Sequence, residues 1–143
     1  IKYEIKGKEL ILRFKNNQQQ NEIQVLRKKG VDYSSLDPFV GYWQMTKATV
    51  GKTEAIVKEG ECLNGEVVAS SFGFTLYLNF PEQNGQCKKT INTYEWIKEG
   101  GKYYNVSNPA EKTLWDISFS NNNRYMTFAI DNGRTVMHFT KVK

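Results

Sequence analysis

The stretch Phe39-Val40-Gly41-Tyr42-Trp43-Gln44-Met45 decides the fold. It follows a short turn-forming segment that ends at Pro38, and it predicts the opening strand of a β-barrel. Gly41 has no Cβ, so it lets the chain approach closely at the barrel floor, and Trp43 would plug that floor. A glycine that stands beside a core tryptophan by chance is the alternative explanation of these residues.

Predicted strands follow this stretch at close spacing. The clearest one alternates without exception and ends at Pro81, with Phe72, Phe74, Leu76, Leu78 and Phe80 on one face. A meander of about eight strands that must hide its edges closes into an up-and-down barrel, and an open β-sandwich is the alternative. No segment predicts a helix of useful length. The other predicted strands cover residues 40–50, 54–59, 66–71, 89–98, 102–106, 114–119, 124–130 and 135–142.

Residues 1–31 predict a separate β-meander. Its strands and turns resemble those of the C-terminal end, where residues 117–142 repeat the order strand, turn, strand, turn, strand. Such an echo predicts that residues 1–31 are the last strands of a preceding barrel or a duplicated sheet packed on the main one, and two unrelated meanders are the alternative. We therefore expect a meander at residues 1–31, a linker with one helical turn at 32–38 and the barrel at 39–143.

The positive charge of the chain belongs to the same N-terminal piece. Residues 1–31 carry eight basic and three acidic side chains, whereas the rest of the chain carries twelve of each. An excess of this kind is typical of a surface for nucleic acid or anionic lipid, or of the solvated lysines of an edge hairpin. No aromatic pattern interleaves with these charges, so we expect the solvated hairpin and no nucleic-acid partner.

Cysteine use and hydropathy suggest where the protein works. The only two cysteines, Cys62 and Cys87, predict one disulfide, with two free thiols as the alternative. A disulfide implies an oxidising compartment, so we expect an exported protein that is periplasmic, at the cell surface or secreted. No apolar run reaches about 18 residues, so no membrane span is expected. The chain begins at Ile1, and we expect a leader or upstream region to be missing. A lipid anchor on that missing N-terminal region is one possibility.

The Gly41-x-Trp43 tripeptide, the turn before it and the strand meander resemble the lipocalins. The likeness covers about residues 36–143 and is closest to the compact lipocalin-like, calycin-type domains of exported bacterial proteins. In lipocalins a cation from the last strand lies across the motif tryptophan. The resemblance implies that Lys141 has this role, because Arg134 lies at the opposite end of an antiparallel strand, roughly 20 Å away. The family usually has arginine there, and its Thr-Asp-Tyr type turn is not evident.

The functional prediction is binding without catalysis. His138 is the only histidine, and no nucleophile, metal or phosphate motif stands in the sequence, so we expect neither an enzyme nor a cofactor or metal. We expect a small hydrophobic ligand in the barrel. A structural or interaction module whose barrel is filled by its own side chains is the alternative, and the sequence leaves the oligomeric state undetermined. The predicted ligand-binding residues are Trp43, Phe72, Phe74, Leu76, Leu78, Trp96, Phe128 and Met137.

Overall fold

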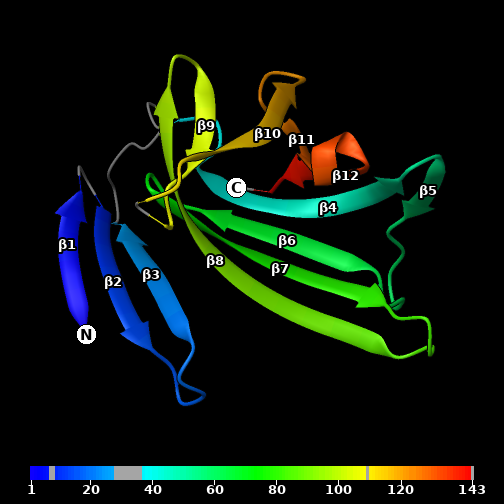
Figure 1. The fold of residues 1–143 in the computed structure, drawn as a ribbon, viewed down its shortest axis with the longest axis horizontal. Coiled ribbons are helices and arrows are strands. Elements are labelled where there is room, and N and C mark those ends of the chain that lie inside the picture. Colours follow the sequence, from blue (N-terminus) through cyan, green and yellow to red (C-terminus); the bar gives the residue numbers. More distant parts are fainter. Residues whose placement is uncertain (7–8, 28–36, 109, 143) are drawn as a thin grey trace.

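The computed structural model describes residues 1–6, 9–27, 37–108 and 110–142, and it is built almost wholly of β-strands (Figure 1). Two sheets are present in this part of the chain. Three N-terminal strands form one sheet, and nine strands form the other. The helical turn expected within residues 32–38 falls largely outside the described residues.

The larger sheet closes on itself. Eight strands pair in the order β4, β6, β7, β8, β9, β10, β11 and β12, and β12 pairs back with β4. Every pairing is antiparallel. The predicted up-and-down barrel is thus confirmed, and the sandwich alternative is wrong. The strands are β4 (Gly41–Val50), β6 (Asn64–Ala69), β7 (Gly73–Pro81), β8 (Cys87–Glu99), β9 (Lys102–Asn105), β10 (Thr113–Ser120), β11 (Tyr125–Ile130) and β12 (Thr135–Lys141).

Strand β4 pairs with two different strands along one edge. Its first half, Gly41 to Gln44, pairs with β6, and its second half, Lys47 to Val50, pairs with the short exposed strand β5 (Thr53–Ile56). A register shift against β12 separates the halves, because Thr46 has no opposite residue. Such a bulge adds one residue and bends the strand. It moves Ala48 onto the same inner face as Met45, so the long strand keeps its apolar side inward.

The barrel core sits at the end where β4 begins and β12 ends. Its buried side chains come from the loop before β4 and from seven of the strands, in keeping with the alternation of inner and outer residues along each strand. Polar loops of asparagine and glycine join the strands, and Asn121, Asn122 and Asn123 all have positive φ, which asparagine tolerates better than most residues. The core comprises Phe39, Val40, Trp43, Met45, Val67, Ala69, Phe74, Trp96, Tyr103, Met126, Phe128, Met137 and Phe139.

The N-terminal meander is an antiparallel sheet of β1 (Lys2–Lys6), β2 (Glu9–Lys15) and β3 (Asn21–Arg27), and it lies against the outside of the barrel (Figure 1). Its barrel-facing side buries Glu9 and Ile11. The carboxylate of Glu9 accepts hydrogen bonds from the backbone N–H and the hydroxyl of Ser71, in the turn between β6 and β7. The meander is therefore docked partly through polar contacts.

Candidate functional site

Trp43 closes the floor of the barrel. The side chain is fully buried, and its indole N–H donates a hydrogen bond to the carbonyl oxygen of Phe39 at 2.9 Å. The pairing of β4 with β12 puts Lys141 opposite Trp43, and the Lys141 Nζ lies 5.2 Å from the centroid of the indole ring. The same ammonium donates to the carbonyl oxygen of Pro38 at 3.1 Å. Arg134 lies at the other end of β12, where its carbonyl oxygen accepts from the Gly51 N–H.

Asp37 completes the floor, and the sequence analysis missed it. Its carboxylate accepts hydrogen bonds from the Phe39 N–H at 2.9 Å, from the Tyr103 hydroxyl at 2.5 Å and from the Lys98 ammonium at 3.0 Å. Burial and the hydrogen bond to Asp37 raise the pKa of Tyr103 far above its ordinary value. Asp37 therefore ties the chain just before β4 to β8 and β9. A carboxylate directly before Pro38 is a turn signal, but its partners are distant in sequence and could not be predicted.

Aromatic rings fill the barrel above this floor. Phe74 has ring centroids of Tyr94, Trp115 and Phe128 within 5.2, 5.5 and 5.8 Å, and Trp115 lies 5.3 Å from Phe128. These spacings are those of tilted and edge-to-face aromatic pairs. Side chains of the protein itself thus occupy this level of the barrel.

The eight predicted ligand-binding residues take three different positions. Five belong to the buried core, and Leu76 and Leu78 are half-buried and pack against it farther along β7. Phe72 stands apart from this cluster, because it precedes β7 in a turn. The Arg13 guanidinium carbon lies 4.5 Å from its ring centroid, so Phe72 belongs to the contact with the meander. The five core members are Trp43, Phe74, Trp96, Phe128 and Met137.

The predicted disulfide is confirmed. Cys62 and Cys87 are bonded, with an S–S distance of 2.07 Å and Cα atoms 5.7 Å apart. The bond joins the loop between β5 and β6 to the first residue of β8. It holds together the end of the barrel opposite Trp43.

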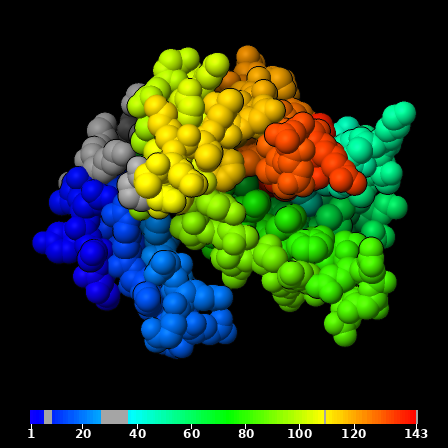
Figure 2. Space-filling view, viewed as in Figure 1, coloured from blue at the N-terminus to red at the C-terminus, as the bar shows by residue number. Residues whose placement is uncertain are grey.

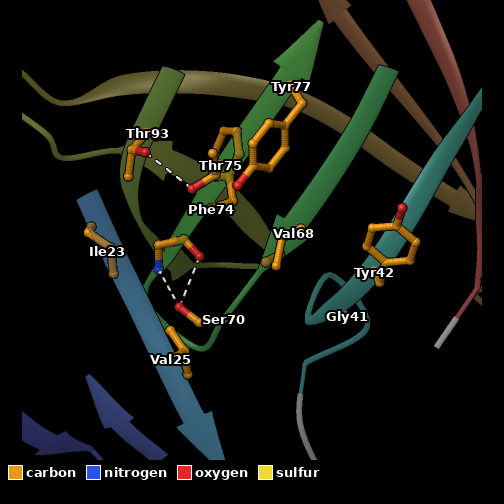
Figure 3. Close-up of a pocket in the computed structure, with 12 residues that line it drawn as sticks. Ile23, Val25, Gly41, Tyr42, Val68, Ser70, Phe74, Thr75, Tyr77 and Thr93 are labelled. Atoms are coloured by element: carbon orange, nitrogen blue, oxygen red, sulfur yellow. Dashed lines mark hydrogen bonds between the residues drawn. The ribbon is translucent and has the colours of Figure 1, made fainter. Parts of the chain in front are cut away.

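A cavity of about 330 Å³ lies outside the barrel, between the meander and the barrel wall; we call it the outer cleft. Figure 2 shows the surface hollowed between the N-terminal strands and the strands of the barrel. In Figure 3, Ile23 and Val25 of β3 stand on one side, and Val68 of β6 and Tyr42 of β4 stand on the other. Neither the outer cleft nor its residues were predicted. The full lining is Ile23, Val25, Gly41, Tyr42, Val68, Ala69, Ser70, Gly73, Phe74, Thr75, Tyr77 and Thr93.

A tight turn allows the meander to approach the barrel at the base of the outer cleft. The Ser70 hydroxyl donates to the Gly73 carbonyl oxygen at 3.0 Å and accepts from the Gly73 N–H at 3.1 Å (Figure 3). A Cβ on Gly73 would lie 3.1 Å from the Tyr94 carbonyl oxygen and 3.8 Å from the Ile23 Cδ1. Glycine is thus the residue that fits where β3, β7 and β8 converge.

The outer cleft is apolar with hydroxyl groups at its wall. The Thr75 and Thr93 hydroxyls lie 3.1 Å apart and hydrogen-bond to each other. Burial, followed by a hydrogen bond to Glu66, raises the pKa of the Tyr42 hydroxyl. No residue that lines the outer cleft carries a formal charge at neutral pH. This lining can bind a small apolar molecule and can orient one hydroxyl or carbonyl group of it.

Three further observations concern metals, membranes and the single histidine. Among the described residues, no group of three or more His, Cys, Asp and Glu side chains could hold a metal ion. No helix in the same part of the chain is long and apolar enough to cross a membrane.

His138 lies on β12 and hydrogen-bonds to the Tyr125 hydroxyl. Burial and, to a smaller extent, the Lys47 charge lower the pKa of His138.

Comparison with known proteins identifies one similar structure by name. No family model matches the chain, and no curated protein matches it. A crystal structure of a lipocalin-like protein from Bacteroides uniformis is similar to it, with 13% sequence identity and a TM-score of 0.46. The similarity covers 73% of this chain and 99% of that chain. The closed pairing of eight antiparallel strands is in itself a lipocalin-like barrel architecture.

Proposed function

We propose that this domain binds a small hydrophobic molecule in the outer cleft, while the aromatic core of the barrel serves as its rigid scaffold. The observation that carries the proposal is the placement of apolar side chains from two separate sheets around one uncharged cavity, with Ile23 and Val25 facing Val68. A cavity of about 330 Å³ is within the range of small-molecule sites.

The cleft supports affinity through apolar contact and orientation through its hydroxyl groups. Val68 and Tyr77 are both more than a third exposed and gain burial when a ligand covers them. Burying about 300 Å² of apolar surface at ~25 cal/mol per Å² gives about 7.5 kcal/mol before ordering costs, which sets micromolar affinity as the upper limit. The hydroxyl pair of Thr75 and Thr93 offers one polar anchor on the same wall.

The test is calorimetric titration with a panel of fatty acids and sterols against two matched variants. Val68→Glu places a charge in the outer cleft, and we expect it to weaken binding at least tenfold because a carboxylate would be buried against the ligand. Val50→Glu is the control, since Val50 is similarly exposed at the far end of β4. Saturable binding that Val68→Glu leaves unchanged, or no saturable binding at tens of micromolar, would contradict the proposal.

The barrel interior is the second candidate site, as the sequence predicts. Its specific support is the Trp115 indole N–H, which is buried and has no hydrogen-bond partner in the described part of the chain. Leu76 and Leu78 lie half-buried on the same inner face. A ligand in the barrel would change tryptophan fluorescence in the wild type and in Val68→Glu alike. A ligand in the outer cleft would lose its effect in Val68→Glu, so one titration series separates the two sites.

We further infer that the protein works by binding and not by catalysis, in an oxidising compartment outside the cytoplasm. The disulfide between Cys62 and Cys87 supports the compartment, because such bonds persist where thiols are not kept reduced. Alkylation of the native protein isolated from its source cells, with and without reductant, tests this inference. Two alkylatable thiols without reductant would contradict it.

A further inference from the structure

The side of the meander that faces away from the barrel is apolar and uncovered. Tyr3 and Ile5 are 74% and 75% exposed, and Leu26 is 49% exposed. Cross-strand pairing puts Tyr3 opposite Leu12, and Ile5 opposite Leu10, which pairs in turn with Leu26. Residues opposite each other in a sheet share a face. The three strands therefore present a mainly apolar face to solvent, interrupted on β3 by Gln24 opposite Leu12, and it is larger than the isolated apolar side chains that surfaces usually carry.

The side that meets the barrel is mixed in character. It carries Ile11, Ile23 and Val25 beside the charged residues Glu9 and Arg13, and the Arg13 guanidinium lies 3.3 Å from the Glu95 carboxylate. A sheet with one face in water normally turns its apolar face to the core. The apolar face of the meander thus has the composition of an inner surface that needs another layer.

The same rows of side chains occur inside the barrel. Strands β10, β11 and β12 align Phe119 with Met126 and Phe139, and these three point into the core. In the meander, Ile5 aligns with Leu10 and Leu26 in the same order.

The rows also have the same position relative to the first hairpin turn. The pair Ile5–Leu10 stands one step from the turn-closing pair Lys6–Glu9, as Phe119–Met126 stands one step from Ser120–Tyr125. The next apolar pair is two residues farther in both sheets. The first hairpin of the meander therefore repeats the pairing and the apolar rows of β10 and β11. Strand β3 matches β12 at Leu26, whereas Gln24 stands where β12 has Met137.

Both outer edges of the meander are open within the described residues. Strand β1 pairs only with β2 there, and β3 pairs only with β2. Their counterparts in the barrel, β10 and β12, have their second edges paired with β9 and β4. Open edges are normally blocked or covered in stable proteins. The meander thus lacks the neighbours that its counterpart has on both sides.

We propose that β1, β2 and β3 are the last three strands of a second barrel, completed by a segment of the same polypeptide that precedes Ile1. This segment supplies counterparts of β4 and of β6 to β9. The counterpart of β9 pairs with β1, the counterpart of β4 pairs with β3, and their inner side chains cover Tyr3, Ile5 and Leu26. Consecutive strands usually pair, so the counterpart of β9 comes directly before β1 in the chain.

A second copy of this chain satisfies fewer of these observations. Two copies stacked face to face would cover the apolar side chains but would leave the edges of β1 and β3 open. They would also give no reason for the match between the meander rows and those of β10 to β12. The upstream segment accounts for the face, the edges and the register together.

The test compares the 143-residue chain with the same gene product extended upstream by as many residues as β4 to β9 span. Ile5→Lys should leave the melting temperature of the 143-residue chain unchanged and lower that of the extended chain by several degrees. Ile91→Lys is the control, because Ile91 is exposed on the barrel wall and should be neutral in both. Hydrogen exchange at the β1 amides should slow in the extended chain.

Three results would overturn the proposal. The first is a gene whose upstream codons do not encode alternating strand segments. The second is an Ile5→Lys substitution that is neutral in the extended chain. The third is a 143-residue chain that sediments as a dimer and becomes a monomer with Ile5→Lys, which would assign the face to a second copy.

Discussion

A lysine at the end of the chain and a tryptophan at the start of the barrel meet at the floor. The cation of Lys141 lies over the Trp43 ring and also donates to the Pro38 carbonyl oxygen. The indole N–H is satisfied by the Phe39 carbonyl oxygen. Pro38 lies in the loop before β4 and Trp43 in β4 itself, so the last strand is anchored to the first by a side chain as well as by the backbone.

The Lys141→Met variant should therefore destabilise the barrel. Loss of the cation over the ring and of one hydrogen bond should lower the free energy of unfolding by about 1 kcal/mol. Urea denaturation measures this change, with Lys52→Met as the control because Lys52 is exposed in the turn after β4. Equal stability of Lys141→Met and the wild type would show that the contact contributes nothing.

Phe72 is a residue whose position could not be predicted from strand alternation. Phe72 has the same parity as Phe74 and Leu76, and alternation alone predicts a common face for the three. Phe72 lies inside the tight hydrogen-bonded turn from Ser70 to Gly73, and the regular strand β7 begins only at Gly73. Parity carries no information across a turn, so Phe72 meets Arg13 of the meander and not the centre of the barrel.

At the scale of elements, the long strands β7 and β8 reach beyond the aromatic core and are held there by the disulfide. Cys87 begins β8, and Cys62 lies in the loop that leads into β6. The core side chains gather at the opposite end, so this end has fewer buried contacts to stabilise it. We therefore expect the covalent bond to stabilise this end of the barrel.

Replacing both cysteines by serine should cost about 3.5 kcal/mol of unfolding free energy. The cysteines are 25 residues apart, and the closure entropy of a loop of that length in the unfolded chain corresponds to this value. Urea denaturation measures the cost, and the reduced, alkylated wild type provides an independent comparison. A loss below about 1 kcal/mol in both would mean that the unfolded chain is not constrained by this bond.

At the scale of the whole molecule, the barrel contains the hydrophobic core, and the meander forms one wall of the outer cleft. Among the described residues, no strand of the meander pairs with a strand of the larger sheet, and the core contains no meander residue. Ile23 and Val25, by contrast, form one wall of the outer cleft. Folding and ligand binding should therefore be separable by truncation.

A chain shortened to residues 37–143 should still unfold cooperatively, with a moderate loss of stability from the exposure of Phe72 and Ser71. It should no longer bind any ligand that Val68→Glu displaces from the full chain, because one wall of the outer cleft is missing. Circular dichroism and calorimetry measure the two properties. Retained binding would place the site in the barrel, and failure to fold would show that the meander is part of the folding unit.

The sequence by itself determined the strands, their antiparallel order and the disulfide. The local signals are the alternation along β7, the turn residues between strands and the Gly41-x-Trp43 stretch. A meander of about eight strands leaves no edge strand exposed when it closes into a barrel. The position of Lys141 at Trp43 follows from the same reasoning, since antiparallel neighbours meet end to start.

The tertiary structure alone decided which face of the meander meets the barrel. Both faces of β2 carry apolar residues, Ile11 on one and Leu10 and Leu12 on the other, so alternation cannot choose between them. The buried Glu9 and its hydrogen bonds to Ser71, far away in the sequence, select the face with Ile11. The outer cleft and the uncovered apolar face are both consequences of that choice, because they arise only when two separately predictable sheets are placed side by side.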